Sequence, residues 1–291
     1  LTHFKKHTRE TIEPLRQAIN SGLEFGDIEY ACHAADYYCA HLFFNGEHLD
    51  YVQEQQKHYI DFAGNFAQQY QFYLLKIIGQ LVANLRGTTD NPLLLMGEML
   101  NESETIAYLE SINNLMSLFR VFFAKTLLCY LFKDYEAALE NAKRALKSST
   151  LVEGNISFTK HIYYYSLALL ALYFQETESK QQQYLKQVEE NQQKMKYWAF
   201  HGPMNYQHKY NLVEAEKARV LGQSFSAMEY YDLAIDGAKE NGYVQDEALA
   251  NELAGEFYLA LGRNKVARTY LIDAYYAYIR WGAKAKVKDL E

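Results

Sequence analysis

Hydrophobic positions recur at helical spacing along most of the chain, and the alternation typical of strands is nearly absent. The stretch DYEAALENAKRALKSS, which begins at Asp134, is a good example, because its apolar residues fall three or four positions apart on one helix face. The chain also has only 3 prolines, and proline is the strongest helix breaker. We therefore expect an all-α protein with about 11–12 helices.

Three segments share the spacing A-x3-Ω-x2-A, in which Ω stands for a variable residue. The matching triplets are Ala138-Ala142-Ala145, Ala227-Tyr231-Ala234 and Ala267-Leu271-Ala274. Small residues let two helices approach closely and a larger neighbour fills the space beside them, which is the residue logic of the tetratricopeptide repeat (TPR). The last two triplets are 40 residues apart and the first two 89. The pattern thus predicts a superhelix of degenerate, lengthened TPR-like helical hairpins.

The N-terminal part is less regular. After a helix near 10–21, Ala31 and Ala35 repeat the small-residue face, and 47–85 reads as one nearly continuous helix that Gly64 can bend. The stretch 86–103 reads as a loop, and Ser103 as the N-cap of the next helix.

No convincing linker interrupts the chain. We expect a single α-helical repeat domain over 1–291, irregular over about 1–113 and with TPR-like hairpins over about 114–282. Because the chain begins at Leu1 and not at methionine, we expect it to be a fragment of a larger multidomain protein.

The most apolar segment, Leu115 to Phe132, is interrupted by Arg120 and Lys125. We expect a buried helix with two charges at its rim and not a membrane span. The net charge of −7 argues against nucleic acid as a partner, because phosphate binding needs a clustered basic surface. Three cysteines without a C-x-x-C pair favour free thiols in a reducing cytoplasm.

The sequence contains no phosphate-binding loop, kinase signature, nucleophile elbow or zinc-spaced Cys/His cluster. His201 and His208 flank a Gly-Pro step, and a metal site would need further ligands and a spacing of three or four. We expect instead a helix-loop-helix corner, with Pro203 in the first turn of a helix over 204–221. We expect this chain to be non-enzymatic and without cofactors; an enzyme with a novel site around these histidines is the alternative.

Residues on the first helix of each hairpin should line a concave groove. The candidate groove or partner-binding residues are Arg120, Tyr130, His201, Asn205, His208, Lys209, Glu216, Arg219, Glu252 and Glu256. Mixed charges with tyrosines suit a peptide or partner segment. The alternatives are a groove that is solvated or filled by the protein's own termini, and, for Glu252 and Glu256, a solvated helix face.

The segment KYWAFHGPMNYQHKYNLVEAEKARVLG and the stretch AMEYYDLAIDGAKENGYVQDEALANELAGEFYLALGRNKVARTYLIDAYYAYIRWGAKAKV carry a resemblance. They resemble the central helical region of large bacterial hybrid sensor kinases of the cyanobacterial type, as do GDIEYACHAADYYCAHLFFNGEHL and LCYLFKDYEAALENAKRAL. The specific motifs are H-x-PMN-x-x-HK and the ending RWGAKAKV, and the resemblance covers nearly all 291 residues. The first motif falls on His201, Pro203, Met204, Asn205, His208 and Lys209.

In that family a Ser/Thr kinase-like domain and an AAA-type NTPase domain come before the helical region, and a GAF sensor and a histidine kinase follow it. The resemblance implies signal transduction between catalytic domains, with neighbouring kinase, NTPase or sensor domains of the same chain as partners. It carries over no catalytic residue. The leading hypothesis is a cytoplasmic, non-catalytic TPR-like scaffold that binds protein segments or relays conformation, with no nucleic-acid or membrane partner. The alternative is a receptor domain that binds a short peptide or small ligand in its groove.

Overall fold

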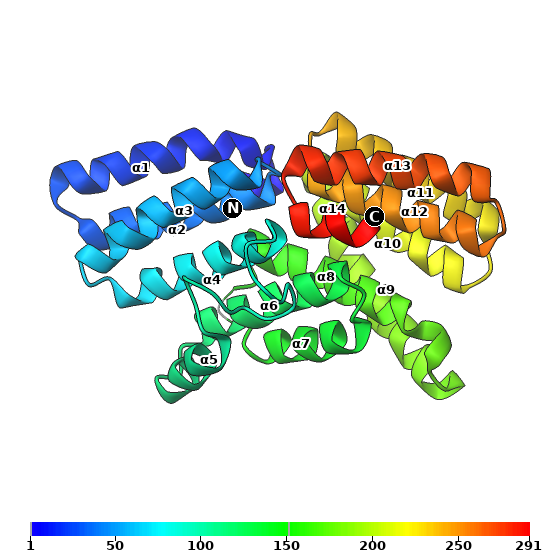
Figure 1. The fold of residues 1–291 in the computed structure, drawn as a ribbon, viewed down its shortest axis with the longest axis horizontal. Helices are drawn as coiled ribbons and strands as arrows, with labels where there is room; N and C mark the ends of the chain where they lie inside the picture. Colours follow the sequence, from blue (N-terminus) through cyan, green and yellow to red (C-terminus); the bar gives the residue numbers. More distant parts are fainter. Residues whose placement is uncertain (1, 151) are drawn as a thin grey trace.

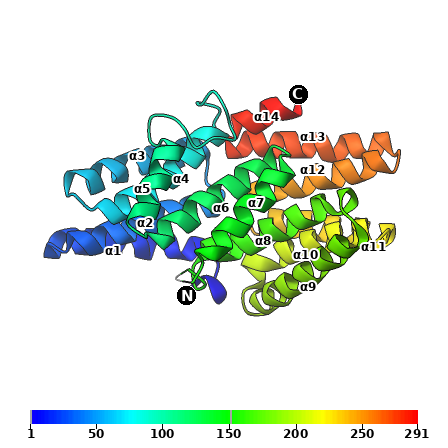
Figure 2. The same ribbon diagram turned by 90° about the horizontal axis from the view of Figure 1, so that it is seen from below.

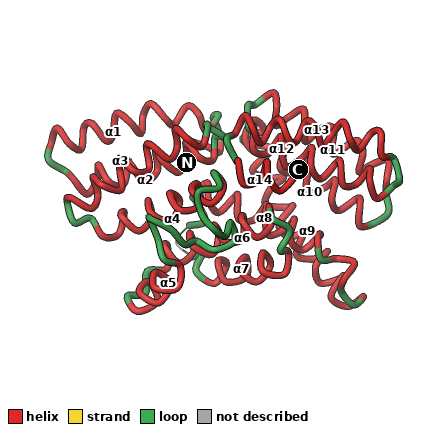
Figure 3. Tube along the Cα trace, in the orientation of Figure 1, coloured by secondary structure: helices red, strands yellow, loops and turns green. Residues whose placement is uncertain are grey.

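The computed structural model describes residues 2–150 and 152–291, and the described residues form helices joined by turns, with no strand among them (Figure 3). Three short 3-10 helices and fourteen α-helices lie within these described residues. The α-helices are α1 (Ile12–Phe25), α2 (Ile28–Phe44), α3 (Leu49–Asn65), α4 (Gln69–Leu85), α5 (Glu102–Ser111), α6 (Leu115–Leu131), α7 (Tyr135–Lys147), α8 (Ile156–Ala171), α9 (Glu178–His201), α10 (Pro203–Val220), α11 (Ser224–Glu240), α12 (Val244–Ala260), α13 (Asn264–Trp281) and α14 (Lys284–Leu290).

The prediction of an all-α superhelix of helical hairpins is confirmed, but the expected number of helices is too small. The expected single helix over 47–85 is two helices, because the chain turns between Asn65 and Gln69, with Ala67 at φ 53°. Helix α14 was not expected at all. The N-cap before α5 is Asn101 and not Ser103, since the Asn101 side chain accepts from the amide of Glu104.

The predicted small-residue faces are buried between helices. Ala227, Ala234, Ala267 and Ala274 are at most 1% exposed. Helices α12 and α13 come so close that a Cβ on Gly255 would lie 2.7 Å from Leu271. This confirms the predicted arrangement, in which a large side chain fills the space beside a small one.

The C-terminal hairpins repeat with a regular turn. Gly222, Gly242, Gly262 and Gly282 follow each other at intervals of 20 residues, all with φ between 69° and 86°. Because L side chains rarely adopt this left-handed conformation, glycine is favoured at each helix end. One helical hairpin therefore takes 40 residues, in agreement with the spacing of the alanine triplets.

The superhelix closes on itself. Helices α1–α4 form one arm and α10–α14 the other, with α5–α9 between them (Figures 1 and 2). At the junction of the arms Gln245 donates to the carbonyl of Phe44 at 2.8 Å, and the rings of Phe43 and Trp281 lie 5.9 Å apart. The end of α2 thus meets the start of α12 and the end of α13, across more than 200 residues of sequence.

Helix α6 is buried along almost its whole length. Its two charges do not both lie at a rim as expected, because Arg120 is only 4% exposed and pairs with Asp36 of α2. Lys125 pairs with Glu102 at the start of α5. Within the described residues, none of the helices combines the length and the apolar character that a membrane span needs.

Candidate functional site

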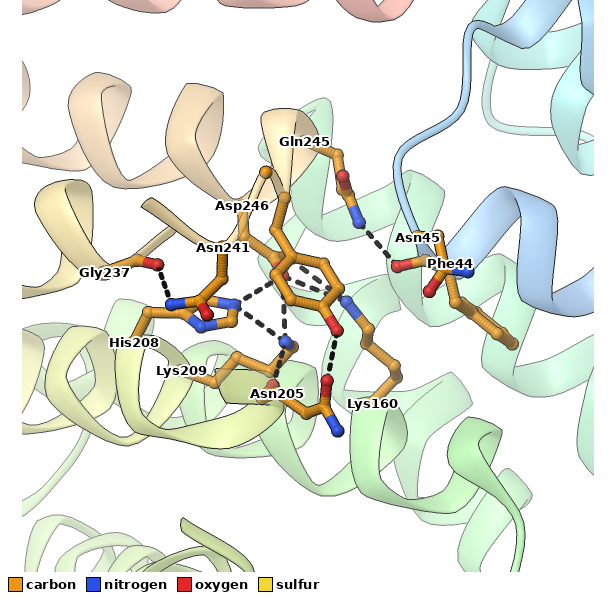
Figure 4. A network of polar contacts seen from close by, with 12 residues as sticks. Phe44, Asn45, Lys160, Asn205, His208, Lys209, Gly237, Asn241, Gln245 and Asp246 are labelled. Carbon is orange, nitrogen blue, oxygen red and sulfur yellow. Dashed lines mark hydrogen bonds and ion pairs between the residues drawn. The ribbon is translucent and has the colours of Figure 1, made fainter. Parts of the chain in front are cut away.

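His208 and Lys209, the last two residues of the H-x-PMN-x-x-HK motif, belong to a buried ion cluster between α8, α10 and α12 (Figure 4). Asp246 of α12 accepts three contacts on Oδ2, from Lys160 Nζ at 3.1 Å, Lys209 Nζ at 3.0 Å and His208 Nε2 at 3.0 Å. All four residues are at most 4% exposed. The carboxylate of α12 therefore holds together three basic groups, one from α8 and two from α10.

The local structure explains why the carboxylate lies there. Asp246 is in the first turn of α12, where the positive end of the helix dipole favours an anion. His208 stacks on the ring of Tyr243 with centroids 4.9 Å apart. On its other side it packs against α11, since a Cβ on Gly237 would lie 3.3 Å from His208 Cβ. The absence of a side chain on Gly237 lets α11 approach the backbone of α10 closely at His208.

The charges in the ion cluster are unbalanced. Burial lowers the pKa of Lys209 to about 7, with Asp246 opposing the shift and Lys160 adding to it. Burial, together with the charge of Lys209, lowers the pKa of His208 to about 3. Burial alone would raise the pKa of Asp246, but the charges of Lys160 and Lys209 outweigh it and hold that pKa well below its usual range.

The N-terminal segment 2–11 is tied to the same place by Asn205. The Asn205 side chain donates to the carbonyls of His3 and Lys6, both at 2.7 Å, and accepts from the amide of Thr8 at 3.1 Å. Its backbone carbonyl accepts from Lys209 at 2.6 Å. Segment 2–11, here called the N-terminal strap, is thus one residue away from the ion cluster. At Asn205 the strap fills the space, as in the alternative of a groove filled by the protein's own terminus.

His201 and Arg120 lie elsewhere. His201 is the last residue of α9, exposed, with its ring against Tyr197 and Phe200. Pro203 is the first residue of α10, which confirms the predicted corner. Arg120 is enclosed in its ion pair with Asp36 and does not reach the other candidate residues at the ion cluster.

Four of the predicted groove residues do line one cavity, here called the tyrosine cavity, of about 180 Å³. It lies where the end of α6 and the start of α7 meet α8, α10 and α12. Its lining residues are Tyr130, Tyr135, Ala171, Glu216, Arg219, Leu253, Glu256, Phe257 and Ala260.

The carboxylates at this cavity differ in how far they are paired. Glu216 is 2% exposed, and both its oxygens accept bonds, one from Arg219 at 2.6 Å and one from Tyr231. Glu256 pairs through Oε1 with Lys133 at 2.5 Å and keeps 35% of its side chain exposed. Glu256 is therefore the more accessible of the two.

Glu252 and Glu256 do not form a solvated face, because Glu252 is 2% exposed. Lys286 donates to Glu252 at 2.8 Å, Tyr278 donates to it at the same distance, and Lys133 lies 3.4 Å away. Lys133 thus bridges Glu252 to Glu256 beside the tyrosine cavity. The carboxylate of Glu252 fastens α14 and α13 to α12 instead of facing a groove.

The sequence reasoning missed the partners of the motif residues, above all Lys160 and Asp246. A lone lysine in the apolar run ISFTKHIYYYSLALLALYF was a usable signal, because such a charge needs a buried partner. In the part of the chain that the structure describes, no three His, Cys, Asp or Glu side chains gather closely enough to hold a metal ion.

No family model matches the chain. A stretch of 54 residues, 19% of the chain, is 43% identical to part of "Hybrid signal transduction histidine kinase G" of Dictyostelium discoideum. The match spans 2% of the length of that protein. Part of this chain is therefore similar to part of a signalling kinase.

Proposed function

We propose that this chain is a non-catalytic interaction and relay module of a multidomain signalling kinase. Its TPR-like hairpins would bind or couple neighbouring kinase, NTPase or sensor domains of the same polypeptide, in the cytoplasm. The observation that carries the proposal is the similarity of a 54-residue stretch to a hybrid histidine kinase, in a chain built as a closed array of helical hairpins.

The arrangement of polar contacts supports a relay. The N-terminal strap is bonded to Asn205, whose carbonyl is bonded to Lys209 of the ion cluster, and the cluster joins α8, α10 and α12. A displacement of the strap by a preceding domain would change the partners of buried charges, which makes intermediate positions unfavourable. Such a device favours two discrete arrangements over a gradual one.

The same geometry supports a non-catalytic role. His208 and Lys209 of the motif are 2% and 1% exposed, and both are paired with Asp246. A substrate could reach them only if the packing of three helices opened.

The test is made in the full-length kinase that carries this segment. Replacing residues 2–291 by a flexible linker should uncouple autophosphorylation from the sensor ligand, while Asn205→Ala should weaken the coupling without removing the basal activity. Asn264→Ala, at an exposed position, is the matched control. Coupling that survives the replacement unchanged would exclude the relay.

A second candidate function is a receptor for a short peptide or small ligand, which the tyrosine cavity favours. A ligand that binds only the folded state raises the thermal midpoint of the isolated chain, and the rise grows with the logarithm of its concentration once that concentration exceeds Kd. A screen with short peptides should therefore give a shift that Glu256→Gln reduces. A midpoint that no peptide moves would leave the scaffold as the better description.

A further inference from the structure

The tyrosine cavity contains a buried hydroxyl without a hydrogen-bond partner. Tyr130 is 2% exposed and lines the cavity, and its hydroxyl finds no partner in the described part of the chain. A buried polar group without a partner costs free energy, because it has lost its hydrogen bonds to water. A ligand that brings a hydrogen-bond donor into the cavity would remove that cost.

The ionised groups around the cavity favour a cation. Two carboxylates, Glu216 and Glu256, and one guanidinium, Arg219, line it. Arg219 is already paired with Glu216, through both Nε and Nη2. Lys133 contacts both Glu252 and Glu256, and Lys286 is shared between Glu252 and Asp289. The carboxylates of this connected group thus outnumber its cations by one, and Glu256 is the carboxylate of the cavity lining that stays partly exposed.

The titration of the lining groups agrees with a negative potential. Burial, reinforced by Glu216 and Glu256 among its neighbours, raises the pKa of Tyr130 well above its usual value. Burial also raises the pKa of Glu256, and Lys133 opposes the shift while Glu252 and Glu216 add to it. An added positive charge would relieve the repulsion between these three carboxylates.

The shape and the aromatic walls limit the size of the ligand. The rings of Tyr130 and Tyr135 lie 5.4 Å apart, and Phe257 completes the apolar lining. The faces of aromatic rings attract cations electrostatically. A volume of about 180 Å³ is roughly six times that of a water molecule in the liquid, enough for a slim aliphatic stem with a charged tip.

We infer that the tyrosine cavity binds one basic group, an ammonium or guanidinium, on a slim aliphatic stem. Glu256 would pair with the cation, Tyr130 would accept its N–H, and the rings would cover the stem. The inference rests on the interaction role proposed above and names the ligand chemistry. The group can belong to a lysine or arginine side chain of a partner or to a free small amine.

Ligand-observed NMR on the purified chain tests this with four probes. These are the Nα-acetyl methylamides of lysine, arginine and norleucine, and n-butylamine. The lysine and arginine compounds should bind and the uncharged norleucine compound should not. Tighter binding of the amino-acid compounds than of n-butylamine points to a side chain of a partner, and equal binding points to a free amine as the source.

Variants decide whether the site is this cavity. Glu256→Gln should weaken binding of the lysine compound by about tenfold or more, and Tyr130→Phe by severalfold, because each removes one of the contacts assigned to the cation. The matched controls are Glu229→Gln and Tyr276→Phe, both at exposed positions, which should bind as the unchanged chain does. Thermal melting of every variant verifies that the fold is retained.

The inference is overturned if the norleucine compound binds as well as the lysine compound, if folded Glu256→Gln binds normally, or if no basic probe binds at millimolar concentration. Its failure can be told apart from that of the relay. If no basic probe binds but replacement of residues 2–291 uncouples the kinase, the binding inference is wrong and the relay is supported. If the basic probes bind but the replacement has no effect on coupling, the binding inference is supported and the relay is wrong.

Discussion

At the scale of the residue, the interior contains many polar side chains, and most have a defined partner. Asp36 and Arg120 pair with each other, and Asp246 contacts three basic groups. His161 of α8 is different. It is 0% exposed, its ring stacks on Tyr165 at 5.9 Å, and neither ring nitrogen has a hydrogen-bond partner among the described residues. The imidazole therefore contributes packing contacts, but burial makes its protonated form unfavourable.

This cost predicts a pH effect. Burial lowers the pKa of His161 from 6.5 to about 3. Between these values the unfolded chain binds a proton that the folded chain does not, so stability falls as the pH falls through this window. His161→Leu should remove about 2 kcal/mol of the difference in unfolding free energy between pH 7 and pH 5, as measured by urea denaturation at both.

At pH 7, where the imidazole is neutral in both states, the same variant should be at least as stable as the unchanged chain, because two unpaired polar atoms are gone. His201→Leu, at an exposed position, is the control and should not reproduce the effect. An unaltered pH dependence in His161→Leu would show that the ring is protonated in the folded chain.

At the scale of the element, the sequence predicted the C-terminal hairpins well and the N-terminal arm less well. The reason lies in the turns. Gly222 and Gly262 mark helix ends that can be read from the residue type, whereas Ala67 adopts the left-handed conformation without any such signal. The amphipathic pattern runs on through that turn, so α3 and α4 looked like one helix. Helix α14 has only 7 residues, too few for a periodicity to be recognised.

The fit between paired helices can be tested at Gly255. Alanine there gains about 1 kcal/mol of helix propensity, but its Cβ would lie 2.7 Å from both Cγ and Cδ2 of Leu271. Overpacking of this kind costs about 1–3 kcal/mol, so we expect Gly255→Ala to be destabilised by about 1 kcal/mol in urea denaturation. Gly64→Ala is the control, because its Cβ would meet only the edge of the half-buried Phe72 at 3.3 Å.

The double variant Gly255→Ala/Leu271→Ala makes the test specific. If the two side chains compete for one space, the loss in the double variant should be smaller than the sum of the two single losses. Additive losses would mean that α12 and α13 adjust without a steric conflict.

At the scale of the whole molecule, local patterns could not predict the closure. Tyr130, Glu216, Arg219 and Glu256 were identified together because the hairpin pattern places them on first helices, and the structure brings them to one cavity. The contacts that close the superhelix are different, because they join residues about 200 positions apart. Periodicity reports which face of a helix is buried but not which distant helix covers it.

Lys286 fastens α14 to the rest of the C-terminal arm. This side chain is 0% exposed and donates to Glu252 at 2.8 Å and to Asp289 at 2.6 Å. Lys286→Met would leave the buried Glu252 with part of its charge uncompensated, which costs about 3 kcal/mol. Urea denaturation should show this loss, and Lys288→Met, exposed on the same helix, should lack it.

Adding Glu252→Gln to Lys286→Met should recover part of the loss, because the unpaired charge is then gone. Equal stability of the two methionine variants would mean that the bond between Lys286 and Glu252 does not stabilise the packing of α14 on α12.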